Sequence, residues 1–419
     1  MAQAFFGGVH PHDMKAATNE KAIEQLAPPA VVVIPMSMHF GAPCTPLVKA
    51  GDHVKVGQKI GEFHGLGAPI HASVSGTVKA VEPRPYSMGG NITSVVIEND
   101  MQDEVSEEVQ APADPNALSV EEMVEIVKNA GIVGMGGATF PTHVKITSGI
   151  GKVNTVIING AECEPYITGD HRTMLERPEE IIGGAKFLAK MFGVDKVVIG
   201  VEDNKRNGID AMNKVIAEQK APVVVEPLRC RYPQGGEKQL CQAITGRQVP
   251  PGGLPADIGC AVFNINTTCA IYRALTTGMP VVRKIVTVSG SGVVEPKNLE
   301  CPIGTPVSSL LDACGGLKDG TYKLIAGGPM MGMAQYTADI SVAKGTGAIL
   351  AFCENEEKTV ENPQCIRCGK CVSVCPMHLE PLFMYQYASK GMVEELNDAH
   401  IMDCMECGAC SYICPARMH

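Results

Sequence analysis

The sequence predicts a multidomain α/β protein, and three observations carry that prediction. The chain has 419 residues, 45% of them hydrophobic, which is enough for about three domains with cores of their own. Its middle alternates short β-branched runs with amphipathic stretches, as βαβ units around a parallel sheet do. Its N-terminal part consists of short strands and turns, and its C-terminal end is rich in cysteine. The changes of pattern along the chain divide it further than its length does, so we expect four units, at residues 1–100, 115–280, 281–352 and 360–419.

The net charge excludes one class of partner. With 35 Lys and Arg residues against 45 Asp and Glu residues, the formal charge is −10, which repels a phosphate backbone, so we expect no nucleic-acid partner. Residues 1–15 lack the continuous apolar core of a signal peptide, and no run of about 18 apolar residues occurs. These observations predict an intracellular chain that does not itself cross a membrane.

The N-terminal unit reads as an all-β domain. Residues 46–62 and 69–81 alternate valine and isoleucine with polar residues, and glycines mark the turns. These two stretches resemble the half-motifs of a lipoyl/biotinyl-type barrel-sandwich. A swinging carrier of that type needs a lysine at the tip between the halves, and the tip here, FHGLGA at residues 63–68, has none. We therefore expect a structural or docking role for this unit.

An acidic linker and a helix follow. Residues 99–117 are acidic, contain proline and show no apolar period. Ser119 and Glu122 then form a capping-box pattern, an apolar stripe at helical spacing follows, and Gly131 closes the predicted helix.

The middle of the chain predicts a parallel sheet. Strands are expected at residues 153–158, 196–201 and 223–225, and helices at residues 178–192 and 206–218. From residue 283 to 350 the pattern changes to a small α+β unit. A second acidic linker is expected at residues 354–363.

Eight cysteines form two copies of the spacing C-x2-C-x2-C-x3-C-P. The first run is Cys365, Cys368, Cys371 and Cys375, and the second is Cys404, Cys407, Cys410 and Cys414. Zinc sites usually use two CxxC pairs separated by a loop, whereas this tight run followed by proline is typical of bacterial two-cluster ferredoxins. In those proteins the fourth cysteine of each run binds the other cluster. We therefore expect one [4Fe–4S] cluster on Cys365, Cys368, Cys371 and Cys414, and the other on Cys404, Cys407, Cys410 and Cys375.

Two glycines adjoin these cysteines. Gly369 and Gly408 allow the backbone to wrap closely and to direct N–H groups at the sulfur atoms.

A glycine-rich segment suggests a phosphate site. Residues 134–145 read GMGGATFPTHVK, in which adjacent glycines and a lysine can approach an anion. By itself this segment is neither a Walker A loop nor a GxGxxG fingerprint. Three further stretches support it, namely NGAECEP (159–165) at the end of a predicted strand, YPQGGEKQL (232–240) and FNINT (263–267).

These four motifs, in this order, resemble those of the flavin- and NADH-binding subunit of respiratory complex I. Nearly the whole chain is similar to the family of C subunits of the Rnf electron-transport complex, including the FFGGVHP start, NGAECEPYITGDHR, IAGGPMMG and the twin cysteine runs. The resemblance implies a barrel-sandwich hybrid, a Rossmann-like flavin and NAD domain, a β-grasp domain of the soluble-ligand-binding type and a two-cluster ferredoxin-like domain.

The resemblance also assigns residues. It implies that a flavin mononucleotide phosphate is cradled by Gly134, Gly136, Gly137 and Lys145. The flavin pocket would be lined by Asn159, Glu162, Tyr232, Gly235, Glu237, Asn264 and Thr267. Phe140 would stack on the dinucleotide, Glu164 would meet its nicotinamide side, and Glu162 and Glu164 are the candidate catalytic residues.

A flavin beside iron–sulfur clusters implies conversion between electron pairs and single electrons. NADH delivers two electrons as a hydride, a cluster accepts one, and flavin adapts between them. The resemblance implies exchange of electrons between NAD(H) and ferredoxin, coupled by membrane partners to Na⁺ or H⁺ transport. It implies a peripheral position on the cytoplasmic face of the cell membrane, integral-membrane and ferredoxin-type subunits as partners, indirect contact with ferredoxin, and membrane contact only through partners.

Two alternative functions remain open at this stage. One is a soluble paralogous adaptor that passes NADH electrons to another reductase. The other is a cluster-bearing electron-transfer scaffold whose flavin pocket is degenerate. We also expect the barrel-sandwich and the FFGGVHP arm to be docking surfaces, so that removal of residues 1–40 would release the protein from membranes.

Overall fold

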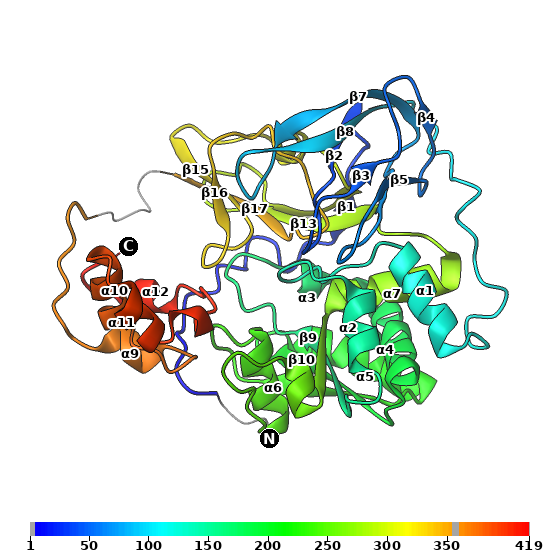
Figure 1. Ribbon diagram of the computed structural model, residues 1–419. Coiled ribbons are helices and arrows are strands. Elements are labelled where there is room, and N and C mark those ends of the chain that lie inside the picture. The colour runs from blue at the N-terminus through cyan, green and yellow to red at the C-terminus, as the bar shows by residue number, and fades with distance from the viewer. Residues whose placement is uncertain (1–4, 354–359, 419) are drawn as a thin grey trace.

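The computed structural model describes residues 5–353 and 360–418, so part of the expected linker at 354–363 lies outside the described residues. The chain forms an all-β unit, a central α/β unit, a mixed six-stranded sheet and a small helical unit that carries the cysteine runs (Figure 1). Figure 1 shows the helical unit at the left, joined to the others at the side of the central unit. Within the described residues, no helix combines the length and the apolar character needed to cross a membrane.

The N-terminal unit contains two antiparallel sheets, as alternating valines and glycine-marked turns predict. One sheet has the order β2-β8-β7-β4 and the other β3-β5-β6. Their strands are β2 (Val31–Pro35), β3 (Thr45–Pro46), β4 (His53–Val54), β5 (Lys59–Glu62), β6 (Ile70–His71), β7 (Gly76–Pro85) and β8 (Asn91–Asn99). Alternate residues of these strands, such as Val32, Ile34 and Ile97, are fully buried between the sheets. The tip at 63–68 faces the central unit, because the Phe63 ring lies 6.0 Å from the ring of His143.

The central unit is a parallel sheet with helices on both faces. The sheet has the order β11-β10-β9-β12, all neighbours parallel. Val156 and Ile158 of β9 share a core with helix α4, whereas Ile157 between them packs with helix α6, as the two-residue period of a strand requires. The strands are β9 (Thr155–Gly160), β10 (Val197–Glu202), β11 (Val223–Leu228) and β12 (Cys260–Asn264). The helices are α1 (Val120–Asn129), α2 (Thr142–Gly149), α3 (Gly169–Glu176), α4 (Pro178–Phe192), α5 (Arg206–Gln219), α6 (Glu237–Thr245) and α7 (Ile265–Thr277), with a 3-10 turn at Pro255–Ile258.

The helix signals in the sequence are confirmed. Ser119 caps α1 and forms a capping box with Glu122, because the Ser119 side chain accepts from the Glu122 N–H and the Glu122 carboxylate accepts from the Ser119 N–H. Helix α4 begins at Pro178 and ends before Gly193, whose left-handed conformation (φ 64°) favours glycine.

The third unit is a mixed sheet with the order β1-β14-β13-β17-β15-β16. Helix α8 covers it, and Leu310 and Leu311 of this helix pack with Val286, Val288 and Leu299 of the sheet. The elements are β1 (Ile23–Gln25), β13 (Arg283–Ser289), β14 (Lys297–Pro302), α8 (Val307–Ala313), β15 (Thr321–Ala326), β16 (Met333–Gln335) and β17 (Ala348–Cys353).

The cysteine-rich unit is built from short helices. They are α9 (Lys370–Val374), α10 (Pro381–Ser389), α11 (Val393–Asp398) and α12 (Ala409–Ile413), with a 3-10 turn at Ile401–Asp403. α9 and α12 contact each other, and each follows a glycine in the left-handed conformation, Gly369 (φ 73°) and Gly408 (φ 74°). The two cysteine runs therefore have the same local geometry.

The N-terminal arm crosses three of the four units. The Gly8 N–H donates to the Val374 carbonyl of the cysteine-rich unit at 2.7 Å, and Val9 pairs with Tyr232 of the central unit. Further along, β1 pairs in parallel with β14 of the mixed sheet. Phe5 and Val9 are buried in these contacts. Phe5, Gly8 and Val9 of the FFGGVHP arm are thus used by contacts within the chain, whereas Phe6 remains 48% exposed, and the docking role of the arm stays a prediction.

A buried lysine joins three units. The Lys344 side chain, fully buried, donates to the Pro69 carbonyl of the N-terminal unit at 2.8 Å and to the Gly131 carbonyl of the central unit at 2.6 Å. Among residues 5–353 and 360–418, no carboxylate lies within 4.0 Å of this ammonium group. Burial lowers the pKa of Lys344 to about 7 from its ordinary value of 10.5.

We predict that Lys344→Met changes the pH dependence of stability. Between about pH 7 and 10.5 the unfolded chain holds one more proton at this site than the folded chain, so Lys344 makes stability rise with pH over that window. The cost of the buried charge is therefore largest below pH 7. Calorimetry should show that the Tm of the variant falls relative to the Tm of the unmodified chain as the pH rises from 6.5 to 9.5. Lys79→Met, at an exposed lysine of β7, is the control, and its Tm difference from the unmodified chain should be the same at both pH values. A Tm difference that is also independent of pH for Lys344→Met would contradict the prediction.

Candidate functional site

Two parallel strands of the central sheet end side by side. β9 pairs with β12 so that Asn159 lies opposite Asn264. β10 and β11 extend the sheet on one side of β9, whereas β12 lies on the other side. In open α/β sheets such a reversal of strand order opens a crevice at the carboxyl ends of the strands, and ligands bind there. Both asparagines therefore lie where the topology favours a ligand.

The glycine-rich loop lies on this crevice. A Cβ at Gly136 would stand 2.7 Å from Nδ2 of Asn264, so the close approach of loop and strand end requires glycine. Thr267 holds the loop, since its Oγ1 accepts from the Met135 N–H at 2.9 Å and donates to the Val133 carbonyl at 3.1 Å. The Thr267 hydroxyl is thus used in positioning the loop.

The remaining glycines shape the outer part of the loop. The Gly134 N–H donates to the Phe140 carbonyl at 2.9 Å, which closes the loop at its two ends. A Cβ at Gly137 would have no heavy atom within 4 Å, so this part of the loop faces open space. Backbone N–H groups arranged in this way can bind a phosphate.

Lys145 lies beside the crevice on α2. Its Nζ donates to Oε1 of Glu237 at 2.6 Å and to the Val262 carbonyl at 3.0 Å. An ammonium group has three N–H donors, so one remains for an anion. Lys145 and Glu237 are both partly exposed, and the structure brings the pair together from α2 and the first turn of α6.

Asn159 connects the strand end to the loop that contains Gly235. Its Nδ2 donates to the Gly235 carbonyl at 2.8 Å and its Oδ1 accepts from the Ala161 N–H at 3.1 Å. The Gly235 N–H in turn faces Sγ of Cys163 at 3.3 Å. The NGAECEP and YPQGGEKQL motifs therefore form one wall.

Glu162 lies behind the crevice and caps a helix. Its carboxylate accepts from the backbone N–H groups of Asp170 at 2.6 Å and His171 at 3.3 Å, at the start of α3. Lys15 of the N-terminal arm lies 3.9 Å away. Burial raises the pKa of Glu162, and the positive charge of Lys15 opposes that shift. These contacts make Glu162 a positioning residue in this structure.

Glu164 reaches the mixed sheet instead. Its carboxylate accepts from the backbone N–H groups of Met330 at 3.1 Å and Met331 at 3.0 Å, within the IAGGPMMG segment. Burial raises the pKa of Glu164, and the two N–H donors favour its charged form. Glu164 thus joins the crevice to the third unit.

Tyr232 lies at the junction with the cysteine-rich unit. Its side chain is 2% exposed, and its hydroxyl donates to the carbonyl of Cys407 at 2.7 Å. Around it, Val9, Cys163, Met405 and Cys407 form one apolar cluster. The wall of the crevice is therefore in direct contact with one of the cysteine runs.

Five cysteines line one cavity. They are Cys365, Cys368 and Cys371 of the first run and Cys410 and Cys414 of the second. The four cysteines expected to share the first cluster therefore all face this cavity, together with Cys410. Apart from the cysteines, the lining includes Ile366, Leu382 and Tyr385.

Four cysteines form a second group, which shares Cys410 with the lining of the cavity. Cys407 and Cys410 lie close enough to Cys375 and Cys404 for their charges to interact. Cys407 is buried at the junction with the central unit and Cys375 is buried within the cysteine-rich unit, whereas Cys404, Cys365 and Cys368 are exposed.

Backbone N–H groups point at sulfur in both runs. Such bonds run from Arg367 to Cys365 and from Glu406 to Cys404, each at 3.4 Å. In the part of the chain that the structure describes, no three His, Cys, Asp or Glu side chains converge on a single metal ion. Two sets of four cysteines with N–H donors to their sulfurs have the chemistry that cubane clusters require, in which each sulfur binds a different iron.

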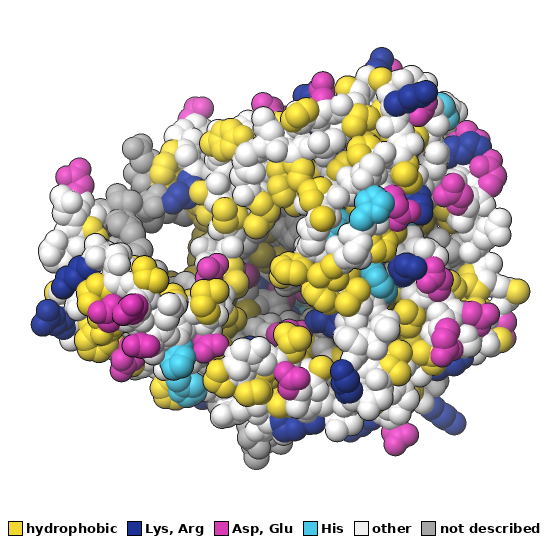
Figure 2. All heavy atoms as spheres, viewed as in Figure 1, with side chains coloured by type: hydrophobic (Ala, Val, Ile, Leu, Met, Phe, Trp, Pro, Cys, Tyr) yellow, Lys and Arg dark blue, Asp and Glu magenta, His cyan; other side chains and the backbone are white. Residues whose placement is uncertain are grey.

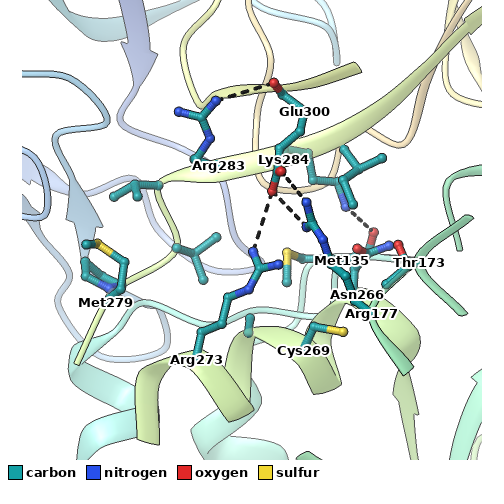
Figure 3. Close-up of a pocket in the computed structure, with 15 residues that line it drawn as sticks. Met135, Thr173, Arg177, Asn266, Cys269, Arg273, Met279, Arg283, Lys284 and Glu300 are labelled. Atoms are coloured by element: carbon teal, nitrogen blue, oxygen red, sulfur yellow. Dashed lines mark hydrogen bonds and ion pairs between the residues drawn. The ribbon is translucent and has the colours of Figure 1, made fainter. Parts of the chain in front are cut away.

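Another pocket is lined by Met135 of the glycine-rich segment and Asn266 of the FNINT stretch, but by none of the individual site residues expected from the sequence. Figure 3 shows Arg177 and Arg273 pointing toward Glu300, and Lys284 pointing toward Met135 of the loop. Arg177 donates to Glu300 at 2.9 Å, and Lys284 donates to the Met135 carbonyl at 3.2 Å. The ion pairs around this pocket join the central unit to the mixed sheet, and Lys284 holds the glycine-rich loop through the Met135 carbonyl.

Sequence reasoning missed two residues of the crevice. Asp170 accepts from Nδ2 of Asn264 at 2.8 Å and from Nδ2 of Asn266 at 2.5 Å, and so orients the strand-end asparagine. Its place in the first turn of α3 was a usable signal. Lys15 donates to the carbonyls of Glu162 and Glu164 at 2.9 Å each. No local pattern marks Lys15, because its partners lie about 150 residues away.

Four family models match successive parts of the chain. They are described as the RnfC barrel sandwich hybrid domain (residues 3–102), the Nuo51 FMN-binding domain (127–273), the SLBB domain (285–334) and the 4Fe-4S dicluster domain (358–415). The residues in the crevice and in the two cysteine groups fit these cofactors. FMN and [4Fe–4S] clusters are therefore cofactors of this chain.

Relatives match over nearly the full length. The C subunit of the Na(+)-translocating ferredoxin:NAD(+) oxidoreductase complex of Acetobacterium woodii is 46% identical over 95% of this chain and 90% of its own. The proton-translocating counterpart of Clostridium ljungdahlii is 44% identical over 96% of this chain and 88% of its own. The C subunit of the ion-translocating oxidoreductase complex of Rhodobacter capsulatus is 41% identical over 90% and 73%, respectively.

A solved structure supports the fold alone. An NAD+-reducing [NiFe]-hydrogenase in the H2-reduced state superposes with a TM-score of 0.51 at 19% identity, covering 71% of this chain and 60% of that one.

We predict that serine substitutions reveal crossed ligation by their iron content. From the spacing we expect Cys414 to bind the same cluster as Cys368, and Cys410 to bind the same cluster as Cys404. The double variant Cys368→Ser, Cys414→Ser should then lose no more iron than either single variant, which is about four of eight atoms. Cys404→Ser with Cys414→Ser should lose nearly all iron. Iron and acid-labile sulfide assays on anaerobically purified protein measure this, and about four iron atoms retained in the second double variant would contradict crossed ligation.

Proposed function

The chain belongs to the RnfC family, the C subunits of Rnf-type ion-translocating ferredoxin:NAD(+) oxidoreductase complexes, and from this membership we propose that it exchanges electrons between NAD(H) and ferredoxin through FMN and two [4Fe–4S] clusters. It is one of the subunits of an oxidoreductase. We propose that integral-membrane and ferredoxin-type subunits of the same complex are its partners. They would hold it peripherally on the cytoplasmic face and couple electron flow to Na⁺ or H⁺ translocation.

The contact of Tyr232 with Cys407 is the observation that carries the proposal. A flavin crevice and a cluster site exchange electrons only if they are neighbours, and here one hydrogen bond of 2.7 Å joins the wall of the first to the backbone of the second. FMN supplies the conversion between a hydride pair and single electrons that clusters require.

We propose the following roles in the crevice. Gly134, Gly136 and Gly137 present backbone N–H groups to the FMN phosphate, and the remaining N–H of the Lys145 ammonium group donates to the same phosphate. Asn159 and Asn264 offer amide groups to the isoalloxazine ring from adjacent strand ends. Thr267, Gly235 and Glu162 hold the walls in place through their hydrogen bonds. Glu237 sets the position of Lys145, Phe140 stacks on the dinucleotide, and Glu164 lies toward its nicotinamide side.

The burial of the cysteines supports an order of transfer. Cys407 lies in the apolar cluster with Tyr232 at the junction with the crevice, so the group to which Cys407 belongs is proposed to receive electrons from the flavin first. The group of Cys365, Cys368, Cys371 and Cys414 lies further out and is more exposed, which suits transfer to a partner.

The domain boundaries follow the same proposal. Residues 1–100 comprise the arm and the barrel-sandwich, 115–280 a Rossmann-like FMN and NADH domain, 281–352 a β-grasp domain of the SLBB type, and 360–419 a ferredoxin-like domain. The parallel sheet, the mixed sheet with α8 and the twin helices α9 and α12 support this division.

Oxygen-free purification tests the function directly. We expect about one FMN and eight iron atoms per chain, and rapid reduction of both flavin and clusters by NADH in anaerobic stopped-flow spectra. Iron without flavin, and no response to NADH, would favour the scaffold alternative. Full activity in a protein that never copurifies with integral-membrane subunits would favour the soluble adaptor.

We predict that Lys145→Ala and Glu237→Ala lower FMN retention and leave the iron content intact. The first removes the charge beside the proposed phosphate site, and the second removes the carboxylate that positions this charge. Fluorescence of released flavin, compared with iron in the same sample, measures the effect. Lys152→Ala, at an exposed lysine after α2, is the matched control and should retain FMN. Full FMN in both test variants would show that the phosphate lies elsewhere.

We predict that Tyr232→Phe separates flavin reduction from cluster reduction. The variant keeps the buried ring and loses the hydrogen bond to Cys407. FMN and iron content should stay the same and NADH should still bleach the flavin, but cluster bleaching should slow severalfold. Equal rates for both steps in variant and parent would show that this bond does not set the contact between the two sites.

A further inference from the structure

We infer that Phe40 of the barrel-sandwich unit forms, with Phe140 of the glycine-rich segment, a two-ring clamp for the purine of the dinucleotide. The inference rests on the proposed function and adds to it a binding residue from a different unit of the chain. The two ring centroids lie 6.0 Å apart and the ring planes are tilted by 35°. Phe40 is 56% exposed and Phe140 is half-buried, so faces of both rings remain open to a ligand. Figure 2 shows hydrophobic side chains gathered around a hollow near the middle of the drawn face.

The position of Phe40 is fixed by backbone contacts with the glycine-rich segment. The Phe40 N–H donates to the Thr139 carbonyl at 3.1 Å, one residue before Phe140. Next to it, His39 is buried and its Nε2 lies 3.0 Å from the Ala42 carbonyl. Gly41 has a φ of 124°, and a Cβ there would collide with the Leu66 carbonyl. The turn is therefore held in one shape while the Phe40 ring itself remains exposed.

An exposed aromatic ring held in this way has no structural need to be aromatic. Burial stabilises a phenylalanine, and Phe40 gains little from burial, since more than half of it remains in contact with water. Aromatic side chains beside a nucleotide site stack on bases, and such stacking accepts any base because each has a π-face. The exposed rings beside the phosphate-binding loop thus fit a nucleobase.

The geometry favours the purine over the nicotinamide. The nicotinamide has to reach the flavin at the strand ends of Asn159 and Asn264, against which Gly136 of the loop lies, whereas Phe140 follows four residues later and its partner ring belongs to the barrel-sandwich. Carbon atoms pack best at about 3.5–4.0 Å, so a base between two rings needs about 7–8 Å. Rotation of the exposed Phe40 side chain widens the separation of the two rings from 6.0 Å to this distance. Binding energy gained at this remote end holds the nicotinamide at the reacting end.

Two ligands separate purine recognition from other effects of Phe40→Ala. ADP-ribose carries the adenosine and lacks nicotinamide, and its equilibrium binding, measured by calorimetry, needs no catalysis. We expect Phe40→Ala to raise the Kd of ADP-ribose roughly 5- to 100-fold, the range given by loss of one base–aromatic stack. The kcat/KM preference for NADH over reduced nicotinamide mononucleotide, which lacks adenosine, should fall by a similar factor. Phe40→Trp should restore both values.

The control and the contrary outcomes are distinct. Leu47→Ala removes another exposed apolar side chain of the same unit and should leave both measurements as in the parent chain. Unchanged ADP-ribose binding in Phe40→Ala, or an equal loss of kcat/KM for both reduced substrates, overturns the clamp while the proposed function stands. A parent chain that contains FMN and neither binds ADP-ribose nor oxidises NADH overturns both.

Discussion

The seating of the cysteine-rich helices on the central unit is the constraint on which the rest of the structure depends. Electrons pass between separate cofactor sites only when those sites are held close together, so the unit that carries the cysteines has to be fixed in one position. Three hydrogen bonds fix it. The Tyr232 hydroxyl donates to the Cys407 carbonyl, the Gly8 N–H to the Val374 carbonyl, and the Gln239 side-chain amide to the Pro376 carbonyl. All three use backbone carbonyls at or next to cysteines, so the joint holds the segments that bind the clusters.

Buried ammonium groups fix the arrangement of the other units. Lys15 and Lys344 are each buried and donate to backbone carbonyls of other units. Taking a charge out of water is costly, and the cost is offset only where several acceptors converge on it. A shifted arrangement would remove acceptors and leave the charge unpaired. These lysines therefore favour one arrangement of units more than they add to stability.

The sequence predicted what depends on neighbours along the chain. Helix α4 has the expected bounds, the capping box at Ser119 is present, and the two cysteine runs adopt the same fold because each contains its own glycine. It also placed Asn159 at a strand end. It did not predict that Glu164 binds the N–H groups of Met330 and Met331, or that Lys15 binds the carbonyl of Glu162. Those contacts join residues about 150 positions apart, and neither periodicity nor spacing encodes them.

The pairing of β1 with β14 has a consequence for biosynthesis. The N-terminal arm is synthesised before its partners, because its strand partner begins at Lys297 and the acceptor of the Gly8 N–H lies at Val374. Domains generally fold in order of synthesis, so the barrel-sandwich and the central sheet can form while the arm remains loose. Closure of the arm then has to wait until the chain has been made at least as far as Val374. Because Val374 lies within the first cysteine run, the arm and that run can take up their joint position only together.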